Sequence, residues 1–585
     1  MFRTRDRQNS LFESSLLLPA EKQARLDRTW ARPFRDAALP RIDERAFADL
    51  YCADNGRPNK PVATVVGMLI LKEMFDLTDE EVLASLEFDL RWHVALGLES
   101  GEAHCCQKTL HNFRAKLIAS DRSALLFEQM TGRIIEALGL STDPQRLDST
   151  HITSNMARLT RLGLYCETIR LFLRDLSQSH PKLFAQVPIS LGRRYLKEDG
   201  QPTGYADARR EEGRRRLPVA GRDLWRLVDR FDHHAHISKW DSFGLLKRLL
   251  QEQCETTTKS GKVDSSEADA DLAPVPVKVK EAKQVGSDSL QSPHDADATY
   301  GHKGKGYEVQ VAETYGNKIE HEDQGKQTDS PQDQADDARS ADVVKPEMIT
   351  YVALTNSCGS DADAALPAMA NLAQRNLCPE ELVADTTYSS TSNVLAAKAK
   401  QVTLIGPVAG NVQRPVDEEV TIGDFQINEE DASQTRCPME HRPSEQLYDA
   451  TTGKLTLYFE STICRGCRFE KLCPVQITPG RGRTRRHVLK TDLKSAMIQK
   501  RLRQQATMAF KDVYDNRAGI EATNSELKRA HGLGFLRVRG RGPAQLAVCL
   551  KALACNVKRF VRYLAAKAAA PVRVQCSCQL VPAGN

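Results

Sequence analysis

The amino-acid sequence predicts a protein of the α/β class, in which a mixed sheet is flanked by helices and preceded by an all-helical N-terminal domain. Three observations lead to this prediction. Apolar residues in positions 1–140 recur every three or four residues, as they do on one face of a helix. Between residues 141 and 409, short apolar runs alternate with helical segments, which is typical of strands joined by crossover helices. Four cysteines within residues 410–500 predict a zinc-ribbon-like insertion, after which residues 501–585 return to helical periodicity.

Length and composition fit a folded chain of several domains. At 585 residues the chain exceeds what one hydrophobic core usually serves, and 41% hydrophobic with 27% charged residues is ordinary for a globular protein. The longest early apolar run, Val62–Leu71, is about half of the roughly 20 residues that span a bilayer. The first thirty residues lack a secretory signal, so we expect a cytoplasmic protein. The net charge of +5 is small for this length and does not by itself indicate nucleic acid as a partner.

The N-terminal residues predict four helices. Apolar residues at i, i+3, i+4 and i+7 place the first helix from Val62 onward. Thr78 followed by Glu81 forms a capping-box pattern, which marks the start of the second helix. The same periodicity predicts two more helices, around residues 109–116 and 125–138.

The segment Arg146–Ile152 breaks the helical pattern, and we interpret it as a strand that carries Asp148 into a new domain. Residues 156–254 return to helical periodicity with many arginines, which predicts a helical insertion. Residues 255–297 and 317–342 are rich in polar residues with few aromatics. We expect both to be disordered linkers without a packed core.

Four further strands complete the predicted sheet, with helices at about 361–375 and 391–400 between them. The third of these strands ends at Asp385, so a second isolated aspartate lies at a strand end. The four strands are Tyr307–Val311, Met348–Leu354, Leu382–Asp385 and Val402–Ile405.

A polar stripe is predicted on one helix near residue 520. Tyr514, Arg517, Glu521 and Lys528 are separated by three, four and seven positions, so on a continuous helix all four project from one face. Another face of the same helix carries an apolar residue at every seventh position: Val513, Ile520 and Leu527. This pattern fits a helix that packs on a sheet and offers polar groups to a cleft, although a solvated amphipathic helix would also produce it.

The stripe resembles the Tyr-x2-Arg-x3-Glu-x6-Lys signature of bacterial insertion-sequence transposases of the DDE type, and every fixed position is matched. The resemblance implies a ribonuclease-H-like core in which Asp148, Asp385 and Glu521 are catalytic. Either aspartate taken alone would equally fit a turn or a helix cap. Further pieces resemble the family in the same order along the chain: Gly56-Arg57-Pro58, Ser292-Pro293-His294-Asp295, Gly306–Gln310, Gly532-Leu533, Arg539-Gly540 and Asn556-Val557-Lys558.

The resemblance also implies a metal-dependent reaction. Two Mg²⁺ ions, for which Mn²⁺ can substitute, activate a water or 3′ hydroxyl and stabilise the leaving oxygen during phosphodiester cleavage, and they prefer oxygen ligands. We assign Asp148 as the bridging ligand, with Asp385 and Glu521 each on one ion. Glu526 is the rival for the third ligand, but it lies five positions beyond Glu521 and off the stripe.

Cationic residues predict contacts with DNA. By resemblance, Tyr514, Arg517 and Lys528 would contact the transposon end, where Arg517 and Lys528 would neutralise phosphate charge. The alternative is that these two residues pair with nearby carboxylates such as Asp515 or Glu526. A basic density elsewhere fits either DNA backbone binding or a solvated surface: Arg481, Arg483, Arg485, Arg486, Lys490, Lys494, Arg537, Arg539 and Arg541.

A possible structural zinc site lies between the second aspartate and the glutamate. The fifteen cysteines form an odd and uneven set, which suits a reducing compartment better than a disulfide framework. Cys464 and Cys467, spaced as Cys-x2-Cys, are followed by Cys473 and preceded by Cys437, and four thiolates can close a tetrahedral zinc site. His441 could replace Cys437, and four reduced thiols without metal are the alternative.

The sequence therefore predicts a DNA transposase that cuts double-stranded DNA at the ends of a mobile element and joins it to target DNA. Because two ends must be brought together, we expect a homodimer on DNA. Two other functions stay open: a zinc-containing DNA-binding protein that has lost catalysis, and a metal-dependent nuclease without a joining step.

Overall fold

The computed structural model describes residues 2–5, 18–52, 58–99, 101–256, 275–316, 344–408, 419–428, 431–479 and 485–569. Its N-terminal part is helical, as the sequence predicts. The capping box is present, because the Thr78 hydroxyl accepts from the Glu81 backbone N–H and the Glu81 carboxylate accepts from the Thr78 N–H. The helices are α1 (Ala20–Asp27), α2 (Ala31–Pro33), α3 (Val62–Met74), α4 (Asp79–Phe88), α5 (Leu90–Leu96), α6 (Gln107–Ala119) and α7 (Leu125–Leu138), with π and 3-10 turns η2 (Phe34–Ala38), η3 (Leu39–Arg41) and η4 (Glu44–Leu50).

The central sheet is mixed, as predicted. Its strands are β1 (Gln145–Ile152), β4 (Thr299–Gly301), β5 (Gly304–Thr314), β6 (Ile349–Asn356), β7 (Glu381–Ala384) and β8 (Thr403–Ile405). The order is β4-β5-β1-β7-β8, and β6 also pairs with β5. β1 pairs antiparallel with β5 and parallel with β7, so it joins the antiparallel and parallel halves of the sheet.

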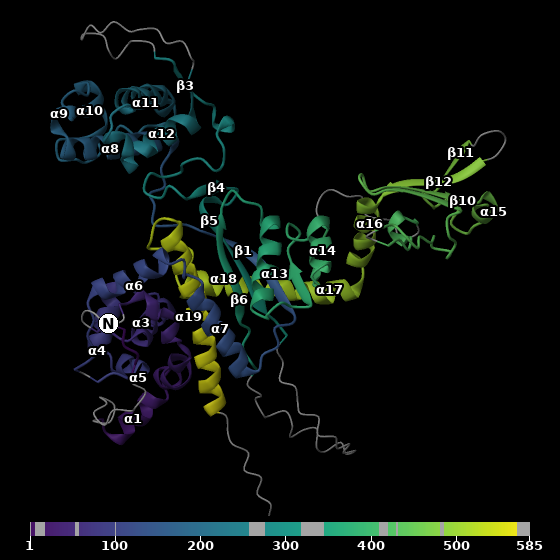
Figure 1. Cartoon of the computed structure of the whole chain (residues 1–585), viewed down its shortest axis with the longest axis horizontal. Helices are drawn as coiled ribbons and strands as arrows, with labels where there is room; N and C mark the ends of the chain where they lie inside the picture. The colour runs from purple at the N-terminus through teal and green to yellow at the C-terminus, as the bar shows by residue number, and fades with distance from the viewer. Residues whose placement is uncertain are drawn as a thin grey trace, which may run out of the picture.

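Helices cover the sheet and connect it to the N-terminal part (Figure 1). α13 (Ala365–Gln374), preceded by the 3-10 turn η8 (Asp361–Ala364), connects β6 to β7, and α14 (Thr391–Lys398) connects the parallel strands β7 and β8. α18 (Gly519–Ala530) packs on β1, whereas α19 (Arg541–Ala569) packs on β6 and on α3 and α7. All thirteen residues of α3 are buried, since neighbouring helices surround it. One hydrophobic core therefore runs from the N-terminal helices through α19 into the sheet.

A second helical body with its own core follows β1 (Figure 1). It consists of α8 (Arg161–Ser179), α9 (Pro181–Phe184), α10 (Ile189–Tyr195), α11 (Arg210–Phe231), η5 (Ile237–Lys239) and α12 (Asp241–Gln253). β2 (Cys254–Thr256) and β3 (Val277–Val279) pair with each other beside it.

The expectation that residues 255–297 lack packing is wrong for the described part of that segment. Residues 275–297 contain β3 and the 3-10 turn η6 (Ala282–Gln284), and Leu290, Ser292 and Asp295 are buried. The Tyr307 hydroxyl donates to Asp295 at 2.7 Å, which ties this polar segment to β5. Polar side chains that find partners in the fold can be buried without an apolar pattern. The second expected linker, 317–342, lies outside the described residues.

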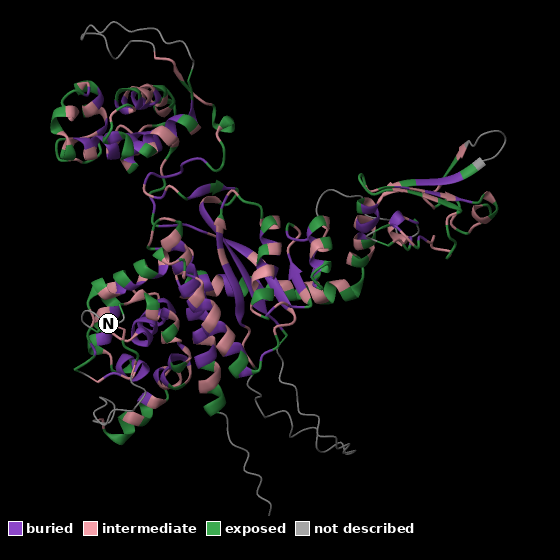
Figure 2. Ribbon diagram, viewed as in Figure 1, coloured by how far each residue is buried: buried purple, intermediate pink, exposed green. Residues whose placement is uncertain are grey.

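The cysteine-containing segment forms a separate four-stranded sheet that projects from the central body (Figure 1). Its order is β11 (Gln476–Pro479), β12 (Arg485–Asp492), β10 (Lys454–Phe459) and β9 (Glu445–Asp449). The turn η9 (Ile422–Asp424) and helix α15 (Ser461–Cys464) lie beside it over a small core. α16 (Leu493–Gln505) and α17 (Met508–Tyr514) lead from it back to α18. Figure 2 shows more exposed and half-buried residues in this arm than in the central sheet.

Across the part of the chain that is described, none of the helices combines the length and the apolar character needed to cross a membrane.

Candidate active site

The two aspartates lie on neighbouring parallel strands. The register of β1 and β7 pairs Gln145 with Leu382 and Leu147 with Ala384. Asp148 is the next residue of β1, and Asp385 directly follows Ala384. Because neighbouring strands lie about 4.8 Å apart, the backbones of Asp148 and Asp385 are adjacent at this point of the sheet. The sequence order alone does not require this proximity, which the parallel pairing produces.

Asp148 lies in an environment that disfavours its negative charge. Its side chain is only 13% exposed. Burial raises the pKa of the Asp148 carboxyl, and the nearby charge of Asp385 raises it further, while Arg517 opposes the shift. A cation placed between the two aspartates would relieve this cost.

The polar stripe does not lie on one continuous helix, contrary to the sequence prediction. α17 ends at Tyr514, the 3-10 turn η10 occupies Asp515–Ala518, and α18 begins at Gly519. The carbonyl of Asn516 accepts the backbone N–H of Gly519, as in a 3-10 turn, and also accepts Nη1 of Arg146 from β1 at 2.8 Å. A tertiary contact to the sheet therefore coincides with the interruption. Ile520 and Leu527 are buried as predicted, whereas Val513 is half-buried.

Arg517 joins the first and third predicted ligands. Its Nη2 lies 3.4 Å from Oδ1 of Asp148, and its Nη1 lies 3.2 Å from Oε1 of Glu521. Nδ2 of Asn524, one turn further along α18, lies 3.4 Å from Oδ2 of Asp148. The structure thus places Glu521 beside Asp148 with a guanidinium between them. Arg517 does pair with carboxylates, but with these two rather than with Asp515 or Glu526.

The other two residues of the stripe, Tyr514 and Lys528, have different neighbours. Tyr514 stacks on Phe510 with ring centroids 5.6 Å apart. Partial burial raises the pKa of the Tyr514 hydroxyl, Arg517 opposes this shift, and three nearby carboxylates add to it. Lys528 belongs to the exposed residues, but partial desolvation of its ammonium, and secondly the neighbouring ammonium of Lys303, lower its pKa. Lys303 in turn lies 3.5 Å from Glu308. Lys528 is therefore separate from the carboxylates, near a second set of charged groups on the sheet.

Sequence reasoning missed a chain of hydrogen bonds that links the neighbourhoods of the two aspartates. Ser149, next to Asp148, donates to Asp361 at 2.9 Å, and Gln310 donates to the other oxygen of Asp361 at 3.0 Å. The Tyr388 hydroxyl, three residues after Asp385, donates to Gln310. In the sequence, the polar Gln310 between Val309 and Val311 hints at such a contact, but nothing there indicates which residues it bonds.

Glu526, the rival ligand, has a different role in the structure. It accepts from Nη2 and Nε of Arg559 at 2.9 and 3.1 Å. Together with His531 and Cys555 it forms the one group of three possible metal-ligating residues, among those described, whose ligand atoms all lie within 4.8 Å of one another. His531 is buried, its Nδ1 lies 2.8 Å from the carbonyl of Glu73, and burial lowers its pKa to about 4. The pairing with Arg559 favours Glu521 over Glu526 as the third ligand.

The four predicted zinc ligands line one small cavity. Cys437, Cys464, Cys467 and Cys473 surround it together with His441 and apolar residues. Burial raises the pKa of the Cys464 thiol to about 11, and the other three thiols add to this shift. No three of these sulfur atoms lie within 4.8 Å of one another among the described residues. The cysteines are thus gathered but more widely spaced than zinc ligands.

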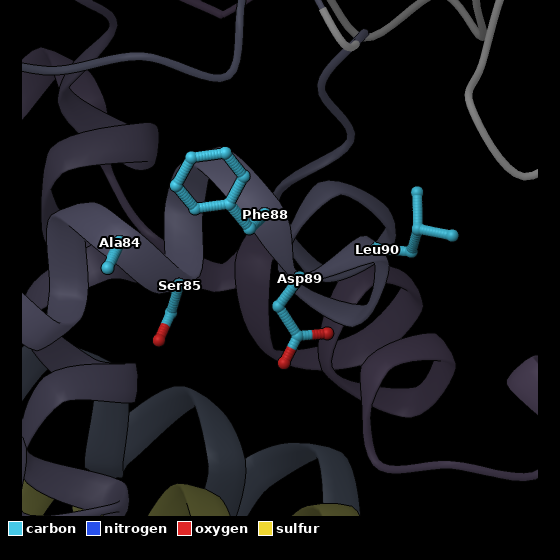
Figure 3. A pocket seen from close by; sticks show the side chains of 5 residues that line it. All are labelled: Ala84, Ser85, Phe88, Asp89 and Leu90. Atoms are coloured by element: carbon cyan, nitrogen blue, oxygen red, sulfur yellow. The ribbon is translucent and has the colours of Figure 1, made fainter.

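A shallow hollow on the N-terminal helices lies apart from these groups. Figure 3 shows its lining side chains, among which Phe88 projects outward from the end of α4. Asp89, which also lines the hollow, caps α5 by accepting from the backbone N–H of Arg91 at 2.9 Å. Its carboxylate, that of Asp89, is paired with Nη2 of Arg91 at 2.6 Å.

Comparison with known families gives two matches. Residues 436–561 match the model of a transposase DDE domain, and residues 32–116 match that of a transposase domain named DUF772. These matches indicate a DDE-type DNA transposase. The first contains Glu521 and the stripe, whereas Asp148 and Asp385 lie outside both matched regions. Neither the curated proteins nor the solved structures gave a significant match.

Proposed function

We propose that the protein cleaves DNA at the ends of a mobile element and transfers the cut strand to target DNA. Asp148, Asp385 and Glu521 are the catalytic carboxylates in this proposal. The observation that carries it is the adjacency of the two aspartates on β1 and β7, with Glu521 held beside Asp148 through Arg517. The sheet order, antiparallel from β6 through β5 to β1 and parallel from β1 through β7 to β8, supports a ribonuclease-H-like core.

The donor set of this site fits Mg²⁺ or Mn²⁺. Three carboxylates supply the hard oxygen ligands that these ions prefer. The buried Asp148 beside Asp385 leaves negative charge that Arg517 only partly compensates. In such sites two ions activate the attacking water or hydroxyl and stabilise the leaving oxygen. The three carboxylates do not all lie within 4.8 Å of one another in the described chain, so we expect the exposed Glu521 side chain to move inward on metal binding.

The side chains around the carboxylates then have distinct tasks. Arg517 holds positive charge between Asp148 and Glu521 and is placed to contact a phosphate near the scissile bond. Tyr514, stacked on Phe510, offers a hydroxyl and an aromatic ring near the same carboxylates. The exposed Lys528, with Lys303 near it, would bind DNA phosphates further along the duplex. Double-stranded DNA is the proposed partner, and a homodimer is the proposed assembly.

The cysteine cavity is proposed as a structural zinc site. Its small sheet has a core of few buried apolar residues, and closed zinc sites stabilise such folds directly. Zn²⁺ would displace the thiol protons and draw Cys437, Cys464, Cys467 and Cys473 together, because four thiolates on zinc are closer than these thiols are. His441 also lines the cavity and is the alternative fourth ligand.

Nicking of supercoiled plasmid DNA in Mn²⁺ tests the catalytic proposal without knowledge of the terminal repeats. Asp148→Asn and Glu521→Gln remove one ligand charge each, and we expect either change to reduce nicking at least a hundredfold. Asp515→Asn is the matched control, because Asp515 is an exposed carboxylate in η10 and is expected to leave nicking unchanged. Full activity of Glu521→Gln would refute the proposal. Nicking without joined products, using DNA that carries the element ends, would identify a nuclease instead.

A further inference from the structure

We propose that Arg146 is a positioning residue that sets the location of Glu521 relative to Asp148. This inference rests on the proposed function. Arg146 lies on β1 two residues before Asp148, so the two side chains leave the same face of the strand. Neither the signature nor any pattern in the sequence singles it out.

The guanidinium of Arg146 is buried and fully engaged. Its side chain is 6% exposed. Nε donates to Glu313, its cross-strand partner on β5, at 2.8 Å, while Nη2 donates to Glu347. Nη1 donates to the carbonyl of Asn516 at 2.8 Å. One planar group therefore connects two carboxylates near the sheet to the turn that precedes α18.

Gly519, the first residue of α18, has no side chain and so leaves room for this guanidinium. A Cβ atom added to Gly519 would lie 2.0 Å from Nη1 of Arg146 and 2.4 Å from Cζ. Such distances are far inside van der Waals contact, so only glycine lets α18 approach Arg146 this closely. The glycine that weakens the helix in isolation is thus the residue that allows it to dock.

Glu313 provides the matching anchor on the other side of Glu521. Its side chain is fully buried, and its Oε2 accepts from the Thr523 hydroxyl at 2.6 Å and from Arg559 at 3.3 Å. Arg146 holds the chain at Asn516 and Gly519, and Glu313 holds it at Thr523. Glu521 lies between these attachment points.

The contacts of the Glu521 side chain are too few to hold its carboxylate in place. Its side chain is 66% exposed, and its hydrogen-bond partner among the described residues is Arg517. The location of its carboxylate is therefore set by where η10 and α18 rest on β1. Groups that orient metal ligands from behind typically change metal affinity 10–100-fold when they are replaced.

Terbium luminescence of the full chain without DNA measures the carboxylate site independently of catalysis. Arg146→Lys keeps the positive charge beside Glu313 but removes the fork that reaches Glu313 and Asn516 together. We expect its Tb³⁺ dissociation constant and its half-saturating Mn²⁺ concentration for nicking to rise about tenfold. Gly519→Ala should give the same change, because the added Cβ displaces the same guanidinium.

Arg375→Lys is the matched control. Arg375 is a half-buried arginine at the end of α13 that donates to the carbonyl of Thr350 at 2.6 Å, away from α18. Its replacement should lower the melting temperature comparably but leave Tb³⁺ binding unchanged. If Arg146→Lys loses stability with unaltered Tb³⁺ affinity, or if Arg375→Lys weakens Tb³⁺ binding equally, Arg146 has only a structural role.

Asp148→Asn separates failure of this inference from failure of the proposed function. If that variant binds Tb³⁺ as the unaltered chain does, the carboxylates are not a metal site and the proposed function fails. If Asp148→Asn loses Tb³⁺ binding while Arg146→Lys keeps it, the metal site stands and the positioning role of Arg146 is wrong.

Discussion

Glu313→Gln removes one negative charge from a buried ionic network at the central sheet. Glu313 is completely inaccessible and contacts both Arg146 and Arg559, whose side chains are 6% and 16% exposed. Glutamine keeps the size and one acceptor oxygen, so the change isolates the charge. Breaking a buried ion pair by removing one partner typically costs 3–5 kcal/mol. Each arginine keeps a second carboxylate, Glu347 or Glu526, so we expect a loss near the lower end, about 3 kcal/mol.

Hydrogen exchange read by mass spectrometry measures this loss locally, without assuming that a multidomain chain unfolds in one step. A loss of about 3 kcal/mol corresponds to a decrease of roughly 150-fold in the protection of slowly exchanging amides in β5 and α18. Glu347→Gln is the matched control, since Glu347 also pairs with Arg146 but is 40% exposed. It should cost less than about 1 kcal/mol, or a fivefold change in protection. Equal effects of the two variants, or none for Glu313→Gln, would refute the reasoning from burial.

Two further predictions concern titration and metal removal. Burial lowers the pKa of His531 from 6.5 to about 4, so the unfolded chain binds a proton at this residue more readily than the folded chain does. The contribution of His531 to the free energy of unfolding is therefore complete above pH 6.5 and is lost as the pH falls toward 4. The loss amounts to at most about 1.4 kcal/mol per pH unit. Between pH 7 and 4, the free energy of urea unfolding should therefore fall less steeply with pH for His531→Asn than for the unaltered chain. Equal pH dependence of the two proteins would contradict the lowered pKa of His531. Elemental analysis of the purified chain should find about one zinc per molecule, and Cys464→Ser should lower this content while Cys358→Ser, outside the cavity, should not. Absence of zinc in the unaltered chain after expression in zinc-supplemented medium would leave four reduced thiols as the correct interpretation.

Local patterns predicted most elements of the fold because their causes are local. The capping box at Thr78 and the strand that carries Asp148 both follow from residues close together in the chain. The stripe residues Arg517 and Glu521 lie together beside Asp148, although the helix predicted to carry them is interrupted at η10. These predictions held because helix and strand periodicity are set by side-chain spacing along a single segment.

Predictions failed where a distant partner decides the local conformation. The turn η10 forms where Arg146 contacts Asn516, 370 positions away along the chain. Residues 275–297 looked like a linker, yet Tyr307 and the helical insertion give Asp295 and Leu290 buried positions. In both cases the segment's own composition carried no sign of the partner.

The sequence by itself determined the residue types of the candidate site, their order along the chain and the helix or strand on which most of them lie. Only the tertiary structure decided that Asp148 and Asp385 are adjacent, that Arg517 lies between Asp148 and Glu521, and that Glu526 belongs to Arg559 instead. The physical reason is that periodicity reports which side of an element is buried, whereas strand register and buried ion pairs depend on which elements meet. Which elements meet depends on packing over the whole core, and the sequence of a single segment does not determine it.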